Sequence, residues 1–244
     1  MSRLKRILRG HAGKKATKAR ILNEAVNFEK RCIFIAVPKT GTMSVRVQLR
    51  QDGVPLIPNP HLSIMQVRDS LYTFLLFQSL GKNRSFPSAS VPSDESIRQE
   101  AERVFSEFFK FSAVRNPWAR AVSLYSRRAA VQTKDEMSFE AFCAEHVYAS
   151  DTCLHPTLFR NQFDWLCDED GVCVMDYVYR LEDFSRAVQD IAEMTDGRVV
   201  LERRVANRNP DSGSEAYRDL YNDDTRRLIA QRFEKDIDYF KYTF

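Results

Sequence analysis

Two short apolar runs, each followed at once by a polar turn and a helical pattern, constrain the possible folds of this chain more than any other feature. The run at residues 31–37 (RCIFIAV) stops at Pro38, and residues 43–51 can form a helix. The run at residues 109–114 (FKFSAV) stops at Arg115, and a helical pattern follows. Continuous apolar runs of this length are typical of strands that are buried on both faces of a parallel sheet.

Strand-like and helix-like patterns continue to alternate through the rest of the chain. We expect helices over residues 61–80, 95–109, 138–147, 156–166, 181–194 and 215–236, and strands over 172–179 and 199–201. Ser93 or Asp94 is expected to cap the helix at 95–109. Alternation of this kind predicts an α/β fold, which we expect to be a three-layer sandwich around a central parallel sheet with a P-loop-like strand–turn–helix. A chain of 244 residues fits one such domain, which we place at residues 23–244.

Positive charge is concentrated at the N-terminus. Eight of the 37 Lys and Arg residues precede Glu24, the first acidic residue, so 29 remain in the body against 33 Asp and Glu. Because a nucleic-acid-binding domain is usually basic over a whole face, we expect no nucleic-acid partner. Residues 1–22 are expected to form a flexible basic tail. The spacing of Leu4, Ile7 and Leu8 leaves open a peripheral contact with an anionic membrane surface.

Other features of the composition concern the cellular compartment and metals. No apolar run approaches the roughly 20 residues of a membrane-spanning helix, and the first residues lack the apolar core of a secretory signal. The five cysteines form no CxxC pair and are odd in number. The sequence therefore favours reduced thiols in a cytoplasmic protein, and it predicts no metal site.

The turn at residues 38–44 (PKTGTMS) has the composition of an anion-binding loop. A glycine in a strand-to-helix turn lets the backbone approach a phosphate, and the N–H groups of the following helix point at the anion. Lys39 would add a full charge, and the Thr and Ser hydroxyls would add donors. The Walker pattern GxxxxGK[ST] is missing, because Lys39 precedes Gly41. An ordinary turn is the alternative interpretation.

The segment at residues 111–125 (FSAVRNPWARAVSLY) is suited to a second phosphate. Arg115 follows the strand directly, and Pro117 fits the first turn of a helix, where its missing N–H costs nothing. Ser123 comes about two turns later, so a loop arginine and a helix hydroxyl could bind one phosphate together. The alternative is that Arg115 only forms salt bridges and Tyr125 only packs.

Together these motifs resemble those of the sulfotransferases that use 3′-phosphoadenosine 5′-phosphosulfate (PAPS), in the branch of the carbohydrate sulfotransferases and many bacterial relatives. Residues 179–184 (YRLEDF) and 232–244 (RFEKDIDYFKYTF) are also similar to that family, so the resemblance spans residues 31–244. It implies that the 5′-phosphosulfate is held by one set of residues: Lys39, Thr40, Gly41, Thr42, Met43 and Ser44. It implies that Arg115 and Ser123 bind the 3′-phosphate.

The chain departs from the family pattern in two places. Many relatives carry a glycine or a serine at the position of Thr42. The stretch 201–210 matches only loosely a family segment near the cofactor, so we expect its arginines to be solvated: Arg203, Arg204 and Arg208.

The resemblance implies in-line transfer of a sulfuryl group from PAPS to an acceptor hydroxyl, which this branch takes from carbohydrates. Lys39 would neutralise charge on the leaving phosphate oxygen. A histidine suits the general base at neutral pH, and His61 is the first candidate because relatives often carry a histidine in this stretch. His155 is the second candidate, and the carboxylates Glu182 and Asp183 follow. The resemblance favours Glu182 as a structural partner of Arg180.

Two other functions remain open at this point. A P-loop-like kinase or NTPase that uses ATP would need a Walker lysine and a Mg²⁺-binding acid after a strand, for which Asp176 is a weak candidate. A non-catalytic anion- or nucleotide-binding module is the other. Lipid, small-molecule and tyrosine acceptors also stay open. Golgi relatives carry an N-terminal membrane anchor that is not seen here, so a bacterial cytoplasmic setting is expected.

Overall fold

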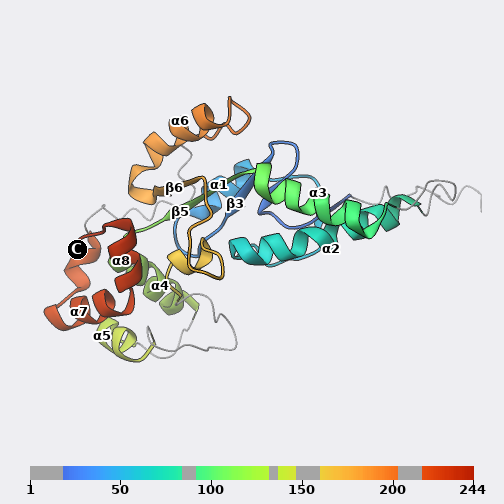
Figure 1. Cartoon of the computed structure of the whole chain (residues 1–244). Coiled ribbons are helices and arrows are strands. Elements are labelled where there is room, and N and C mark those ends of the chain that lie inside the picture. The colour runs from blue at the N-terminus through green and yellow to red at the C-terminus, as the bar shows by residue number, and fades with distance from the viewer. Residues whose placement is uncertain (1–18, 84–91, 132–136, 147–159, 203–215) are drawn as a thin grey trace, which may run out of the picture.

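A computed structural model describes residues 19–83, 92–131, 137–146, 160–202 and 216–244, and the fold is mixed α/β (Figure 1). A four-stranded sheet has the order β2-β3-β5-β6. Its strands are β2 (Val26–Asn27), β3 (Cys32–Ile35), β5 (Phe109–Val114) and β6 (Tyr177–Arg180). β2 runs antiparallel to β3, and the other three strands are parallel. The two apolar runs are therefore adjacent parallel strands, in agreement with the sequence.

The register of the parallel strands determines where the following turns lie. Ile35 of β3 pairs with Ser112 of β5. Val114 of β5 pairs with Arg180 of β6. The carboxyl ends of the three strands therefore meet at one edge of the sheet, which we call the carboxyl edge.

Side chains of the sheet alternate between two hydrophobic clusters, because successive residues of a strand point to opposite faces. Ile33 and Ile35 belong to a cluster that includes four helices: α2 (Ile64–Asn83), α3 (Asp94–Glu107), α4 (Pro117–Val131) and α7 (Asp223–Arg232). Cys32 and Phe34 belong to the other cluster, with α1 (Thr42–Gln48) and α6 (Phe184–Met194). Helices thus pack on both faces of the sheet.

Capping residues explain where two helices begin. The Ser93 hydroxyl accepts a hydrogen bond from the Ser96 N–H, as the sequence predicts, and α3 starts at the next residue. Asn222 and Thr225 form a capping box at the start of α7. The predicted continuous helix over 215–236 is therefore wrong. In the described part, this stretch forms a 3₁₀ turn (Ala216–Leu220) followed by α7. A separate helix, α8 (Glu234–Phe240), then extends beyond the predicted end at residue 236.

Three further expectations are corrected by contacts that the sequence patterns do not reveal. Of the predicted helix at 156–166, the described residues form only a 3₁₀ turn, Phe163–Trp165, because the Phe163 N–H is bound by Asp236. The predicted strand at 172–179 is reduced to β6, and Cys173 instead makes an isolated bridge with Cys167. No strand forms at 199–201, where the neighbouring Glu202 backbone pairs with the Gln48 side chain.

The predicted helices at 138–147 and 181–194 each have an irregular part. The former is a short α5 (Phe139–Ala141) continued by a π-helical turn, Phe142–His146. The latter opens with a 3₁₀ turn, Leu181–Asp183, before α6.

The N-terminal part of the described chain belongs to the folded body. β1 (Arg20–Ile21) pairs with β4 (Val54–Pro55) in a two-stranded parallel ladder. Leu22 is buried in the core. Residues 20–22, which were expected to end the tail, are thus part of the fold, since burial of Leu22 holds them there. Residues 1–18 lie outside the described residues.

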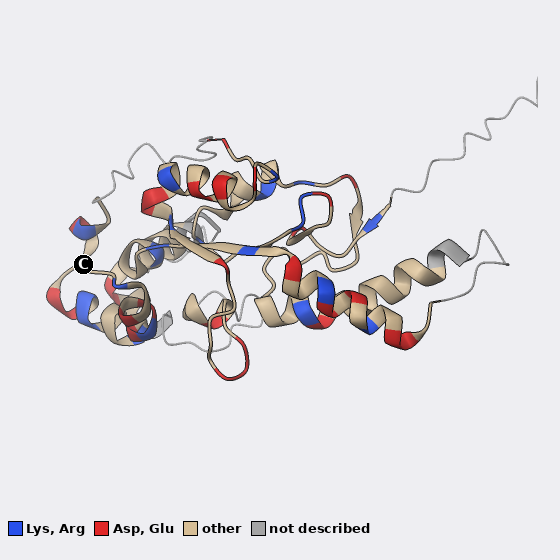
Figure 2. Ribbon diagram, turned by 45° about the horizontal axis from the view of Figure 1, so that its top comes forward, with Lys and Arg blue, Asp and Glu red and all other residues tan. Residues whose placement is uncertain are grey.

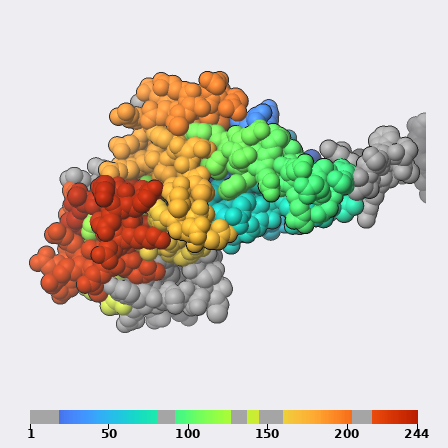
Figure 3. Space-filling view, in the orientation of Figure 1, coloured from blue at the N-terminus to red at the C-terminus, as the bar shows by residue number. Residues whose placement is uncertain are grey.

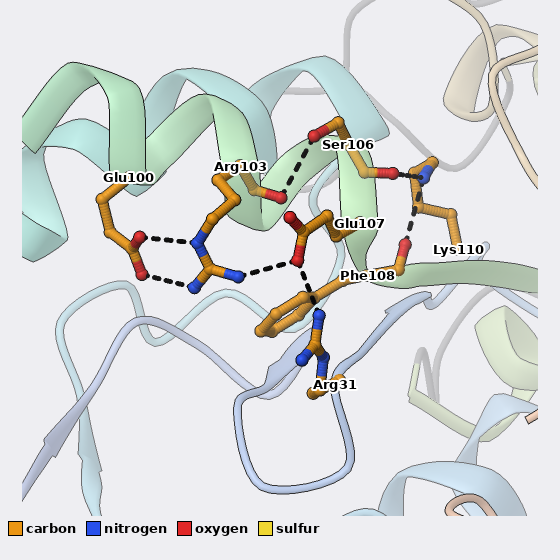
Figure 4. A network of polar contacts seen from close by, with 7 residues as sticks. All are labelled: Arg31, Glu100, Arg103, Ser106, Glu107, Phe108 and Lys110. Atoms are coloured by element: carbon orange, nitrogen blue, oxygen red, sulfur yellow. Dashed lines mark hydrogen bonds and ion pairs between the residues drawn. The ribbon is translucent and has the colours of Figure 1, made fainter.

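Acidic and basic residues are mixed along α3 (Figure 2). Some of their side chains form a network at the end of β3 and β5 that lies opposite to the carboxyl edge (Figure 4). Arg103 binds Glu100 and Glu107, and Glu107 also binds Arg31, which precedes β3. These side chains are 44–46% exposed, so each pair contributes only about 0–1 kcal/mol. No helix within the described ranges is long and apolar enough to cross a membrane.

Candidate active site

Three turns meet at the carboxyl edge of the sheet. An Nη atom of Arg115, after β5, lies 3.4 Å from the carbonyl oxygen of Lys39, after β3. The Asn116 N–H donates to Oε1 of Glu182, after β6, at 2.9 Å. A Cβ at Gly41 would lie 2.5 Å from Leu181. The two sequence motifs are therefore adjacent in space, and the segment after β6 closes against both.

The backbone of the 38–44 turn has two residues in the left-handed region. Lys39 has φ 70° and Gly41 has φ 73°. Glycine adopts this conformation without cost, and its missing Cβ allows the close approach to Leu181. For Lys39 the conformation costs about 1–3 kcal/mol, and such strain concentrates at ligand-binding turns. α1 begins at Thr42 with Gly41 as its N-cap and no capping side chain.

The side chains of this turn are not equally accessible. The Thr40 hydroxyl is fully buried and donates to the Val37 carbonyl at 3.0 Å. It therefore stabilises the turn, and only the backbone of Thr40 is left to contact a ligand. Thr42 is also buried, Ser44 is half-buried and Met43 is exposed.

Arg120, on α4, holds the start of the same turn. Its side chain is 1% exposed, and its Nε donates to the Pro38 carbonyl at 3.0 Å. Burial lowers the pKa of Arg120 to about 10, so it stays protonated at neutral pH. Arg120 lies within the motif at residues 111–125, but the sequence pattern predicts no role for it.

Arg115 is half-buried beside Lys39, and burial lowers the pKa of its guanidinium below the usual range. The nearby Glu182 opposes this shift. Ser123 is half-buried two turns into α4. In the part of the chain that the structure describes, no hydrogen bond joins Ser123 to Arg115. Both lie after β5, but a shared ligand would have to connect them.

His61 lies at the end of β3, beside the 38–44 turn. Its Nδ1 is 2.6 Å from the Ala36 carbonyl oxygen, and its backbone N–H donates to Asn59. Because a carbonyl oxygen can only accept, Nδ1 must carry the hydrogen. The neutral ring then has its lone pair on Nε2, the form that a general base requires. The structure thus brings His61 to the same edge as Lys39.

Several other sequence candidates fall outside the described residues. These are the second base candidate, His155, and the three arginines that were expected to be solvated: Arg203, Arg204 and Arg208.

A model of the sulfotransferase family matches residues 75–243, which is more than half of the chain. The chain belongs to the sulfotransferase family. Searches of curated proteins and of solved structures gave no significant match. The matched part contains Arg115, Ser123 and Glu182 and begins after His61, so the assignments of Lys39 and His61 depend on the motif and on the structure.

The C-terminal segment of this sulfotransferase family member completes the edge in a way that sequence reasoning missed. Asn116 caps α4 through the Trp118 N–H and donates to the Thr243 carbonyl at 2.9 Å. Glu182 accepts from the Tyr242 hydroxyl at 3.3 Å. The expected pairing of Glu182 with Arg180 is not what the structure shows. Arg180, at the end of β6, donates instead to the carbonyl of Phe240, the last residue of α8, at 2.6 Å.

Two buried polar residues near Arg115 were also missed. Gln162 and Asp236 are both fully buried, and they connect the Arg115 backbone to α8. Asp236 lies in the C-terminal segment that resembles the family, which was the one available signal. Nothing in a single sequence relates Gln162 to Arg115.

Proposed function

We propose that this member of the sulfotransferase family transfers the sulfuryl group of PAPS to an acceptor hydroxyl of a carbohydrate. The observation that carries the proposal is the adjacency of the turns that hold Lys39 and Arg115, because an Nη atom of Arg115 lies 3.4 Å from the Lys39 carbonyl oxygen. PAPS carries one anionic group on its 5′ side and another on its 3′ side. A ligand of this kind needs two cationic groups side by side, and both are supplied here from turns at one sheet edge.

The packing of helices on both faces of the sheet supports the finer fold proposal, a three-layer sandwich. The left-handed turn between β3 and α1 supports a P-loop-like phosphate site. In the proposed site, Lys39 and the backbone of residues 40–44 hold the phosphosulfate, and Arg115 and Ser123 hold the 3′-phosphate.

In the proposed reaction the acceptor oxygen forms a bond to sulfur as the bond from sulfur to the 5′-phosphate oxygen breaks. Nε2 of His61 takes the proton of the acceptor hydroxyl. The imidazolium that forms is stabilised through Nδ1–H, which already donates to the Ala36 carbonyl. Lys39 balances the charge that grows on the leaving phosphate, where a preorganised cation contributes most.

The kinase alternative receives no support from the position of Asp176. Its carboxylate accepts from the Lys110 N–H at 2.7 Å, at the start of β6 and opposite to the carboxyl edge. An acid that holds Mg²⁺ against a phosphate would have to lie at the other end of the strand.

The acceptor class, the cytoplasmic setting and a peripheral membrane contact through the basic tail are further parts of the proposal. The resemblance of the sequence motifs to those of the carbohydrate sulfotransferases supports a carbohydrate acceptor. A screen with labelled PAPS against glycans, lipids, small metabolites and tyrosine peptides would identify the acceptor, and labelling of glycans alone is the expected result.

Arg115→Ala is expected to weaken binding of 3′-phosphoadenosine 5′-phosphate more than binding of AMP, which lacks the 3′-phosphate. The difference should be about 1.5–3 kcal/mol, the value of a charge-assisted contact. Ser123→Ala should show the same preference with a smaller loss. Isothermal titration calorimetry measures both.

Arg186→Ala is the matched control, since it removes the same charge from a side chain that is 84% exposed on α6. It should leave both affinities unchanged. Equal losses for the two nucleotides in Arg115→Ala would show that Arg115 does not bind the 3′-phosphate.

A further inference from the structure

We propose that Gln162 and Asp236 are positioning residues for Arg115, so that helix α8 takes part in recognition of the 3′-phosphate. This inference rests on the proposed function, because it concerns the same anion site. Gln162 contacts the Arg115 backbone directly, and Asp236 acts on Arg115 through Gln162 in a chain of hydrogen bonds.

The first step of this chain is a two-point contact between Gln162 and the Arg115 backbone. Oε1 of Gln162 accepts from the Arg115 N–H, and Nε2 donates to the Arg115 carbonyl, both at 2.8 Å. Arg115 comes one residue after the end of β5. The Gln162 amide therefore binds the Arg115 backbone N–H and carbonyl as a neighbouring strand would. The regular hydrogen bonding of the sheet is thereby continued by one residue into the turn.

The second step fixes the orientation of the Gln162 amide. Oδ2 of Asp236 accepts from the Gln162 backbone N–H at 2.8 Å and from Nε2 at 3.2 Å. Oδ1 accepts from the Phe163 N–H at 2.9 Å. Both hydrogens of Nε2 are then used, one on Asp236 and one on Arg115, so Oε1 must face the Arg115 N–H. Without the Asp236 carboxylate, the Gln162 amide could rotate by half a turn, so that its NH₂ group would face the Arg115 N–H, a donor against a donor.

The two segments that carry this chain are held together by additional contacts. The rings of Phe163 and Tyr239 lie 4.3 Å apart, and Lys235 binds Asp164 at 2.6 Å. Figure 3 shows the C-terminal helices (red) packed against the segment that follows residue 160 (yellow and orange). Burial raises the pKa of Asp236, which the charge of Arg120 and the bonds from Gln162 and Phe163 oppose.

These contacts determine where the Arg115 side chain starts, and hence where its guanidinium reaches. The guanidinium extends from the held backbone to the Lys39 carbonyl. Loss of the two-point contact would let the turn move without removing the charge. Small displacements of a binding group reduce its effect on the ligand much more than its effect on folding.

The test replaces Gln162 by methionine, which keeps the volume and removes both bonds to Arg115. Two quantities are measured: the exchange rate of the Arg115 amide hydrogen by NMR, and the ratio of affinities for 3′-phosphoadenosine 5′-phosphate and AMP. Thr195→Val is the matched control. Thr195 is also fully buried, and its hydroxyl is hydrogen-bonded to the backbone of Ile191 and Val199, at the C-terminal end of α6.

In Gln162→Met, Arg115 amide exchange should speed up while Asn116, whose N–H donates to Glu182, keeps its rate. The affinity ratio should fall about tenfold, the loss of one charge-assisted hydrogen bond. Asp236→Asn should lower the ratio in the same direction, and Thr195→Val should leave it unchanged. An unchanged ratio in a folded Gln162→Met protein would overturn the inference.

The wild-type protein provides a second measurement that needs no variant. Its Arg115 amide should exchange as slowly as the amides of β5, although it lies in a turn. Fast exchange there would show that Gln162 does not hold Arg115, and would overturn the inference even if Gln162→Met failed to fold. If wild type shows no preference for the 3′-phosphorylated nucleotide, the proposed function fails, and the amide rates still decide whether Gln162 positions Arg115.

Discussion

Replacing His61 by alanine is expected to lower kcat by about 10²–10⁴-fold, the usual contribution of a general base. The structure supports this role through the contact of Nδ1 with the Ala36 carbonyl, which leaves the lone pair of the neutral ring on Nε2. A base acts only when it is deprotonated, so the wild-type rate should rise with pH on the acidic side. His61→Ala should lose that acidic limb while its affinity for nucleotide stays nearly constant. Steady-state kinetics across pH with labelled PAPS measures both.

His155→Ala is the control for the base, because His155 is the other histidine predicted to lie at a helix start. If His155→Ala abolishes turnover and His61→Ala does not, the role belongs to His155. If neither variant loses turnover, a carboxylate such as Glu182 becomes the candidate, and the assignment of a histidine base is wrong.

Lys39→Ala is expected to lower kcat by about 10²–10³-fold, as the loss of a single preorganised charge at a reacting oxygen does. Alanine keeps the Cβ of Lys39, so the strained left-handed backbone is common to both proteins. Binding of 3′-phosphoadenosine 5′-phosphate should weaken much less, because the charge of Lys39 matters most when the leaving phosphate is fully anionic. Turnover and calorimetry on the same preparation measure the two effects.

Lys30→Ala gives a matched control for the loss of charge. Lys30 precedes β3, whereas Lys39 follows it, so the same charge is removed at the opposite end of one strand. Its turnover should equal that of wild type. A Lys39→Ala protein that keeps turnover within about threefold of wild type would remove Lys39 from the mechanism.

The sequence was sufficient for those parts of the fold that depend on local patterns. The two apolar runs became β3 and β5, Ser93 caps α3, and the turns after both strands lie at one edge because parallel strands share their carboxyl ends. His61 was a candidate because relatives of the resembled family often carry a histidine in this stretch. Its contact with Ala36, which makes it suitable as a base, came only from the structure.

The parts that the sequence did not predict depend on contacts between distant segments. The 3₁₀ turn after Gln162 replaces a predicted helix because Asp236, 74 residues away, binds its backbone. The predicted pairing of Glu182 with Arg180 failed because Asn116 and Tyr242 bind Glu182 from two other segments. Side-chain to backbone bonds of this kind leave no periodic pattern in the sequence.

The central claim is that the carboxyl edge recognises a nucleotide by its 5′ and 3′ anionic groups. Calorimetric titration of the wild-type protein with 3′-phosphoadenosine 5′-phosphate, AMP and ATP tests it most directly. Without added metal, the bisphosphorylated nucleotide should bind more tightly than AMP by at least about tenfold, since one further charge-assisted site is filled. It should also bind more tightly than ATP. Tighter binding of ATP that depends on Mg²⁺, or equal binding of AMP and the bisphosphorylated nucleotide, would contradict the claim.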